Sequence, residues 1–111
     1  MKNLKTINQK TLREKLDAKD DFILLETTPA DEFQKGHLPG AKNLPFVSIE
    51  SRASDLIPEK NSRIVVYGTG SDDDSSAKAS TKLMSMGYTR LYHFAGGKAA
   101  WNAETAPAAA V

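Results

Sequence analysis

The residues of this chain that could do chemistry gather in one short segment, residues 68–76. It offers glycines whose bare backbone can approach a ligand closely, consecutive carboxylates, and hydroxyl groups that could serve as nucleophiles. The candidate binding residues are Gly68, Thr69, Gly70, Ser71, Asp72, Asp73, Asp74, Ser75 and Ser76. The segment joins an apolar run to the clearest helical pattern of the chain. Backbone N–H groups and the positive end of the helix dipole should therefore converge on whatever the segment holds.

The three consecutive carboxylates, Asp72, Asp73 and Asp74, allow two interpretations. Carboxylates on a loop suit Mg²⁺ or Ca²⁺, but the alternating ligand spacing of a calcium loop is absent here. The simpler interpretation is that Asp74 or Ser75 caps the following helix and that the other acids complement its dipole. We therefore expect neither a metal ion nor a cofactor.

The hydroxyls of Ser71, Ser75 and Ser76 would need an activating base to act as nucleophiles. The chain has two histidines, His37 and His93, and no motif positions either of them beside these serines. The Gly-x-Ser-x-Gly elbow of serine hydrolases is also absent. We expect His93 to pack within a strand and the serines to cap the helix.

Short apolar runs alternate with helical patterns along the chain. Strands are predicted at residues 22–25, 63–67 and 90–94, with a further short strand near 41–44. Helices are predicted at residues 9–16, 29–34, 48–56, 75–86 and 98–103, with Asn8 as the cap of the first. This alternation predicts an open, mostly parallel sheet with helices on both faces. In such sheets ligands bind beyond the carboxyl ends of the strands, where residues 68–76 would lie.

Composition restricts the partners and the setting. The chain has 111 residues, 15 Lys plus Arg against 14 Asp plus Glu, and no cysteine. The length suits one domain, with a core over about residues 5–104 and a tail at 105–111. The balanced charge creates no field that would attract nucleic acid or an anionic membrane, so neither is expected as a partner. Without a signal-like stretch or a long apolar run, we expect a soluble, cytoplasmic monomer.

Two motifs resemble the rhodanese-like domain family. Residues 36–41 read Gly-His-Leu-Pro-Gly-Ala, and residues 96–101 read Gly-Gly-Lys-Ala-Ala-Trp. They flank the predicted strand, loop and helix, and the resemblance runs from about residue 7 to residue 101. It implies a three-layer α/β fold with a five-stranded, mostly parallel sheet. The loop is longer than in most rhodaneses and resembles a subgroup with an extended active-site loop.

The chain departs from the family where the family does its chemistry. A rhodanese cysteine, directly after the strand's tyrosine, accepts a sulfane sulfur from thiosulfate or a persulfide and passes it on. The corresponding residue here is Gly68, so no catalytic residue is expected. The family usually reads Asp-x-Arg after the second strand, whereas this chain reads Glu26-Thr27-Thr28 and lacks that positive partner. The resemblance places these three residues and His37 at the pocket edge, with His37 holding a loop through a hydrogen bond.

These departures leave three hypotheses. The first is a catalytically silent module that binds an unknown protein partner or small ligand through residues 68–76. The second is a sulfurtransferase by descent, or a variant of one whose cysteine was replaced. The third, ranked last, is phosphate chemistry, as in the related fold of the cell-cycle phosphatases, because that chemistry also needs the missing cysteine and an arginine.

Overall fold

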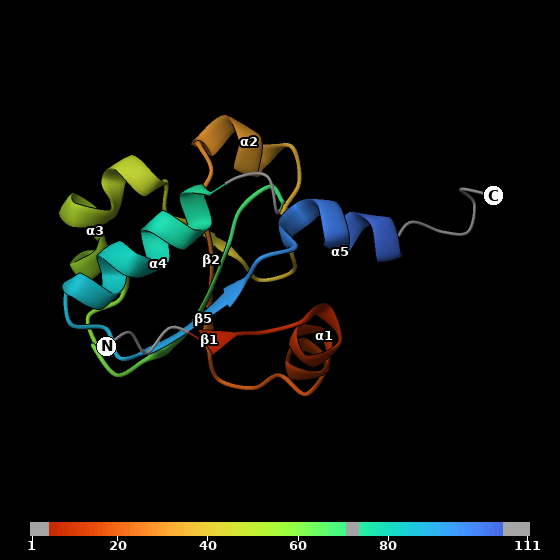
Figure 1. Ribbon diagram of the computed structural model, residues 1–111, viewed down its shortest axis with the longest axis horizontal. Coiled ribbons are helices and arrows are strands. Elements are labelled where there is room, and N and C mark those ends of the chain that lie inside the picture. Colours follow the sequence, from red (N-terminus) through yellow and green to blue (C-terminus); the bar gives the residue numbers. More distant parts are fainter. Residues whose placement is uncertain (1–4, 71–73, 106–111) are drawn as a thin grey trace.

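One parallel sheet organises the chain. The computed structural model describes residues 5–70 and 74–105, the last two by their backbone only. The strands are β1 (Lys5–Thr6), β2 (Ile23–Glu26), β3 (Lys42–Asn43), β4 (Arg63–Tyr67) and β5 (Arg90–Phe94). They pair in the order β1-β5-β4-β2-β3, and every neighbouring pair is parallel (Figure 1). The predicted α/β fold with a five-stranded sheet is confirmed.

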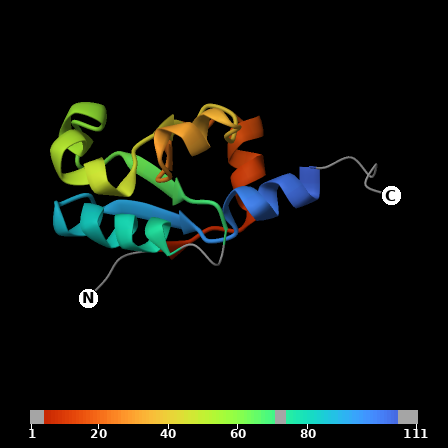
Figure 2. The ribbon, with the colours of Figure 1, turned by 90° about the horizontal axis from the view of Figure 1, so that it is seen from above.

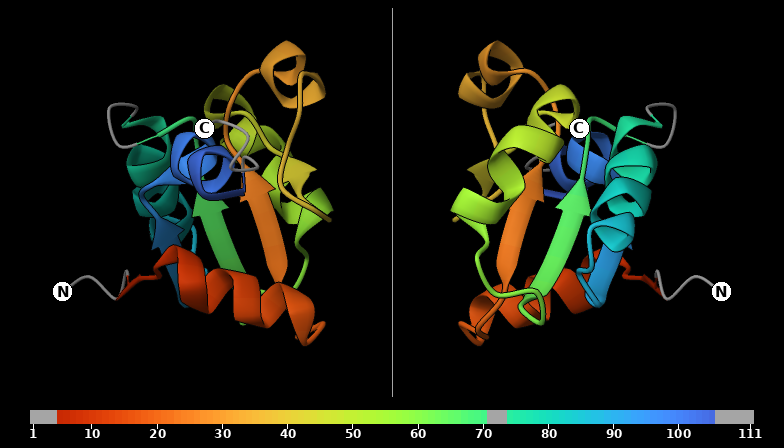
Figure 3. Two further views of the ribbon diagram at one scale, coloured as in Figure 1. Left: turned by 90° about the vertical axis from the view of Figure 1, so that its right-hand side faces the viewer. Right: turned by 90° about the vertical axis from the view of Figure 1, so that its left-hand side faces the viewer.

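Helices cover both faces of this sheet. They are α1 (Gln9–Asp17), α2 (Ala30–Gln34), α3 (Ile49–Leu56), α4 (Ser75–Ser85) and α5 (Gly97–Thr105). A 3-10 turn, Phe46–Ser48, leads into α3. Helices α3 and α4 lie on one face and α1 and α5 on the other, while α2 lies beyond the carboxyl ends of the strands (Figure 3). Helix α4 runs alongside β5 (Figure 2).

Strand β4 is buried on both faces, as its continuous apolar sequence indicates. Ile64 and Val66 pack with residues of α3 and α4 in one core cluster. Val65 and Tyr67 point to the other face and pack with residues of α1 and α5 in a second cluster. All four side chains are at most 2% exposed. The strand therefore ends with the side chain of Tyr67 under α5.

The helix ends follow local sequence signals. The Asn8 side chain accepts a hydrogen bond from Thr11 N at 2.8 Å, which confirms the predicted cap of α1. Helix α4 stops just before Gly87, whose φ of +104° is a conformation that other residues rarely adopt. Within α4, Ala79 and Leu83 are fully buried against the sheet, at the i, i+4 spacing that places two residues on one face of a helix.

Strand β1 was not located from the sequence. It has only two residues, both exposed, and it pairs with β5 at the edge of the sheet. Such a strand has no apolar run of its own, and its position is decided by the neighbouring strand. The other elements lie within one or two residues of their predicted limits. No helix among the described residues is long and apolar enough to cross a membrane.

Candidate functional site

The loop that follows β4 is hydrogen-bonded to the first turn of α5. Gly68 is buried directly after Tyr67. Its carbonyl oxygen accepts a hydrogen bond from Lys98 N at 3.0 Å, and the carbonyl of Thr69 accepts one from Ala99 N at 2.7 Å. The start of helix α5 therefore fixes where the loop leaves the sheet.

The approach of loop and helix is close enough to require glycine at residue 97. A Cβ atom on Gly97 would lie 2.4 Å from the Gly68 carbonyl oxygen and 2.8 Å from Gly70 N. Gly97 also has a φ of +58°. The second glycine of the Gly-Gly-x-x-x-Trp motif is thus explained by this backbone contact.

Glycine at residue 70 is favoured by the limited space around it. A positive φ, the other common reason for glycine in a binding loop, does not apply here. Its φ lies outside the left-handed region, and a Cβ atom there would lie 3.2 Å from the Cβ of Ala99. Three of the candidate loop residues, Ser71, Asp72 and Asp73, lie outside the described residues.

At the start of α4, the capping prediction is contradicted for the side chain of Asp74. Asp74 occupies the N-cap position of α4, but its side chain makes no capping hydrogen bond. Its carboxylate instead lies 3.5 Å from Lys78 Nζ, in a pair whose side chains are both mostly exposed. Because water competes for such pairs, this one contributes at most about 1 kcal/mol.

Ser76 and His93 form a contact that no sequence motif predicts. Ser76 Oγ and His93 Nε2 share a hydrogen bond of 2.7 Å, which joins the first turn of α4 to β5. Burial lowers the pKa of His93. Ser76 is only 1% exposed and does not line the pocket described below, so this pair fastens the helix and does not present a nucleophile.

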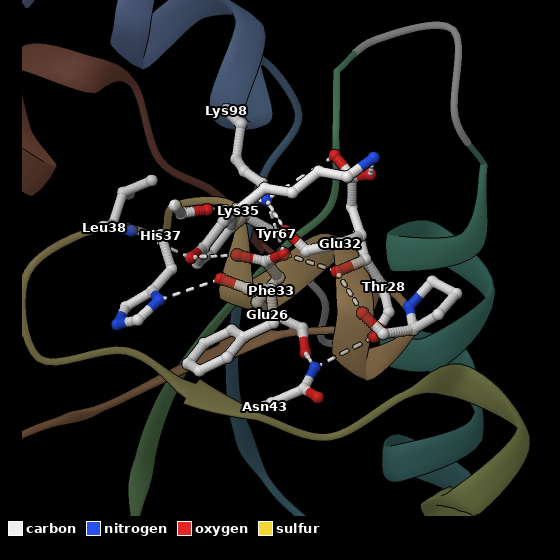
Figure 4. A network of polar contacts seen from close by, with 12 residues as sticks. Glu26, Thr28, Glu32, Phe33, Lys35, His37, Leu38, Asn43, Tyr67 and Lys98 are labelled. Atoms are coloured by element: carbon white, nitrogen blue, oxygen red, sulfur yellow. Dashed lines mark hydrogen bonds and ion pairs between the residues drawn. The ribbon is translucent and has the colours of Figure 1, made fainter.

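A buried polar network lies beneath the loop, with Glu26 at its centre (Figure 4). The Glu26 side chain is fully buried at the end of β2. Its Oε1 accepts a hydrogen bond from the Tyr67 hydroxyl at 2.7 Å, and its Oε2 accepts one from the Thr28 hydroxyl. Lys98 Nζ lies 2.8 Å from the same Oε2. Every oxygen of this buried carboxylate is therefore satisfied, as a buried charge requires.

Lys98 is the residue that the sequence reasoning missed. Besides Glu26, its Nζ atom donates to the carbonyl oxygens of Glu32 at 2.9 Å and Gly36 at 2.7 Å. It thus ties α5 to β2, to α2 through Glu32 and to the turn after α2 through Gly36, and it brings a positive charge to the end of β2. The arginine that the family usually carries after the second strand is absent from this sequence, and Lys98 on α5 brings a positive charge to the same place. A lysine in the first turn of a helix is normally solvated, so its sequence position alone gave no signal.

Tyr67 connects the network to the loop that carries the Gly-His motif. Its hydroxyl accepts a hydrogen bond from Leu38 N at 3.1 Å while it donates to Glu26. Burial raises the pKa of Tyr67, and the Glu26 carboxylate raises it further. The hydroxyl therefore stays protonated and acts as a fixed donor.

A pocket of about 450 Å³ opens beside the loop, at the carboxyl ends of β2 and β4. It is lined by residues of the β2 end, α2, the turn before α3 and the loop: Thr27, Thr28, Pro29, Asp31, Glu32, Pro45, Phe46, Val47, Thr69 and Ser75. Among the described residues, this lining contains two carboxylates, four apolar side chains, four hydroxyl groups and no basic side chain. Such a volume is typical of pockets that bind small molecules or side chains.

The four pocket-edge candidates have separate positions. Thr27 and Thr28 line the pocket, although each is at most 3% exposed. Glu26 lies below them in the polar network. His37 does not line the pocket: its ring stacks on Phe33 at 3.8 Å between centroids, and its Nδ1 is 3.0 Å from the Phe33 carbonyl oxygen. It holds the turn after α2.

The fold and the site together define a class: an α/β domain with an open parallel sheet and a pocket beside the loop that follows its central strand. The family described as the rhodanese-like domain matches residues 8–104, and the chain belongs to this family.

Curated relatives and solved structures agree with this assignment. The chain is 31% identical over 91 residues to the adenylyltransferase and sulfurtransferase UBA4 of Meyerozyma guilliermondii, which covers 76% of this chain and 21% of that protein. It is 30% identical over 95 residues to a sulfurtransferase of Allochromatium vinosum, which covers 86% and 85%. The crystal structure of the Alr3790 protein from Anabaena sp. superimposes with a TM-score of 0.81 at 30% identity, over 91% of this chain and 77% of that one. The chain spans 21% to 64% of the length of the first three curated relatives that it matches.

Proposed function

We propose that this chain is a catalytically silent rhodanese-like module that binds a partner through the pocket beside Gly68, without covalent sulfur transfer. One observation carries the proposal. The buried position directly after Tyr67, where the family keeps its cysteine, holds a glycine, and the sequence contains no cysteine at all. A persulfide intermediate needs a thiol sulfur that can hold a second sulfur atom, and the hydroxyls of Thr69 and Ser75 cannot replace it.

The rest of the site supports a binding role. Gly97 still packs against the Gly68 carbonyl, the buried Glu26–Lys98 pair is fully hydrogen-bonded, and the pocket is open. Burying two charges costs solvation energy that is recovered only in good geometry. A site that has this packed loop, this buried ion pair and an open pocket, but no nucleophile, is suited to binding a partner without reacting with it.

The same framework favours a second candidate, a sulfurtransferase by descent or a variant of one whose cysteine was replaced. Two of the relatives reported above carry the name sulfurtransferase. In this case the surroundings of Gly68 would still suit a thiolate, because a cysteine next to a helix N-terminus has a lowered pKa.

A thiosulfate:cyanide sulfurtransferase assay on the purified chain tests the proposal. We expect a rate at the background level, and turnover clearly above background would contradict it. The Gly68→Cys variant separates the two candidates, with Gly68→Ala as the control that adds a Cβ atom but no sulfur. Persulfide formation on Gly68→Cys, detected by mass spectrometry, would support descent with an intact site. A folded but unreactive Gly68→Cys chain would show that the loop has diverged further.

A further inference from the structure

The charges and the apolar side chains at the pocket point to a particular ligand. We propose that the pocket binds a segment of a partner protein in which an Arg or Lys stands next to a large apolar residue. This inference rests on the proposed function, since it takes the pocket to be a binding site and names the chemistry that the site accepts.

The charge of the pocket wall indicates that the ligand is a cation. Asp31 and Glu32 line the pocket, and none of the lining residues that the structure describes is basic. Glu32 lies 3.5 Å from Lys35 Nζ and 3.7 Å from Lys98 Nζ, so cations already offset its charge. Asp31 accepts a hydrogen bond from Glu32 N at 2.9 Å and has no ion pair with any basic side chain among the described residues. Its carboxylate is therefore available to a cation and unfavourable to an anion such as thiosulfate.

Acidic residues in the first turn of α2 also complement the dipole of that helix. The dipole accounts for carboxylates at these positions, but it does not account for a pocket wall without a basic residue. The two roles are compatible, because a side-chain oxygen that faces the helix end leaves the second oxygen for a ligand.

The apolar rim of the pocket, formed by Phe46 and Val47, indicates that the ligand also has an apolar part. Within the part of the chain that the structure describes, the exposed large hydrophobic side chains are Phe46 at 37% and Val47 at 88%. They are adjacent in the chain, and both line this pocket. Apolar surface that is concentrated at a pocket marks an interaction site more strongly than scattered exposed residues do. Phe46 could also stack under the guanidinium of an arginine.

The position of the rim favours a polypeptide over a small cation. Val47 is almost fully exposed, so a molecule contained in the pocket would leave most of this side chain in water. A peptide can place its cationic side chain at Asp31 and cover Phe46 and Val47 with the apolar side chain next to it. Both surfaces are then used by one ligand.

A random heptapeptide library displayed on phage, selected on the immobilised chain, provides the test. Selections on Asp31→Asn and Asp55→Asn run in parallel. Asp55 lies on α3, is exposed and does not line the pocket, so it matches the charge change without touching the site. We expect peptides with Arg or Lys beside a large apolar residue on the parent chain and on Asp55→Asn, and loss of the basic preference on Asp31→Asn.

The peptide that binds most tightly is then titrated into ¹⁵N-labelled protein, and the amide signals of the protein are followed by NMR. We expect the amides of Asp31 and Val47 to shift, and a Kd that rises about threefold to fivefold in Asp31→Asn, the effect of losing one partly exposed ion pair. Val47→Ser should weaken binding and Val47→Ile should not. A peptide with citrulline in place of arginine should also bind more weakly.

Three results would overturn the inference: enrichment of acidic or uncharged peptides, equal selection on Asp31→Asn, or no enrichment at all. Acidic or uncharged peptides that shift the pocket amides would leave the proposed binding role standing and remove only its cationic preference. Sulfurtransferase turnover by the parent chain would instead remove the proposed function, whatever the peptides do.

Discussion

Lys98 Nζ lies 2.8 Å from Glu26 Oε2, and the two side chains are 10% and 0% exposed. The two residues are far apart in the sequence and belong to helix α5 and strand β2. Their contact brings the first turn of α5 over the end of β2, and the backbone of the same turn bonds the loop after β4. The site therefore depends on an ion pair that does no chemistry itself.

Lys98→Met is expected to destabilise the fold by about 3–5 kcal/mol, because it leaves the Glu26 carboxylate buried without its cation. Urea unfolding measures the change. Glu26→Gln combined with Lys98→Met should cost clearly less than the sum of the two single changes, since neither charge is then left alone. Lys82→Met is the matched control: it breaks the exposed Lys82–Glu50 pair of 3.0 Å and should cost less than about 1 kcal/mol. Equal losses for Lys98→Met and Lys82→Met would contradict the prediction.

Gly97→Ala is expected to destabilise the chain more than Gly40→Ala. Both glycines have positive φ, +58° and +77°, so alanine strains the backbone at either position. The space differs: a Cβ atom at residue 97 would meet the Gly68 carbonyl oxygen at 2.4 Å, whereas nothing lies within 4 Å of one at residue 40. The difference in unfolding free energy between the variants reports the contact between α5 and the loop. Similar losses would show that the loop can move away at little cost.

The fold was largely predictable because its signals are local. The continuous apolar run of β4, the Asn8 cap and the Gly87 stop each act over a few residues, and the structure contains all three. The two-residue edge strand β1 has no such signal, since its place follows from pairing with β5.

The site was predictable only in part. The loop and its missing nucleophile follow from a motif, but the contacts of Lys98 and of the Ser76–His93 pair join residues that are distant in the chain. Sequence spacing contains no information on such contacts. The positive charge beside Glu26 comes from Lys98 on α5 and not from the segment after β2, where the family usually carries it, and this could be seen only in three dimensions.

Tyr67 is expected to contribute less stability in alkaline solution, because the tyrosine of the unfolded chain ionises there while the buried hydroxyl stays protonated. Its raised folded-state pKa means that its contribution is complete below pH of about 10, the value for an unfolded tyrosine, and is lost as pH rises above that value. Tyr67→Phe removes the donor to Glu26 and the acceptor of Leu38 N, and should cost about 1–3 kcal/mol at neutral pH. The cost should shrink in alkaline solution. Unfolding curves at pH 7 and pH 11 check both points, and a cost that grows with pH would contradict the argument.

His93 is expected to make the fold less stable in mild acid. Burial lowers its folded-state pKa below the unfolded value of about 6.5, so the unfolded chain binds the proton more readily. The contribution of neutral His93 is therefore complete above that value and is lost as pH falls below it.

In a His37→Gln chain, His93 is the remaining histidine, and its imidazole NMR signal should titrate with a midpoint below 6.5. His93→Gln should flatten the acid side of the stability curve. Ser76→Ala, which removes the 2.7 Å hydrogen bond but leaves the imidazole buried, should keep most of that slope. A midpoint at or above 6.5 would mean that a nearby carboxylate, and not burial, controls this histidine.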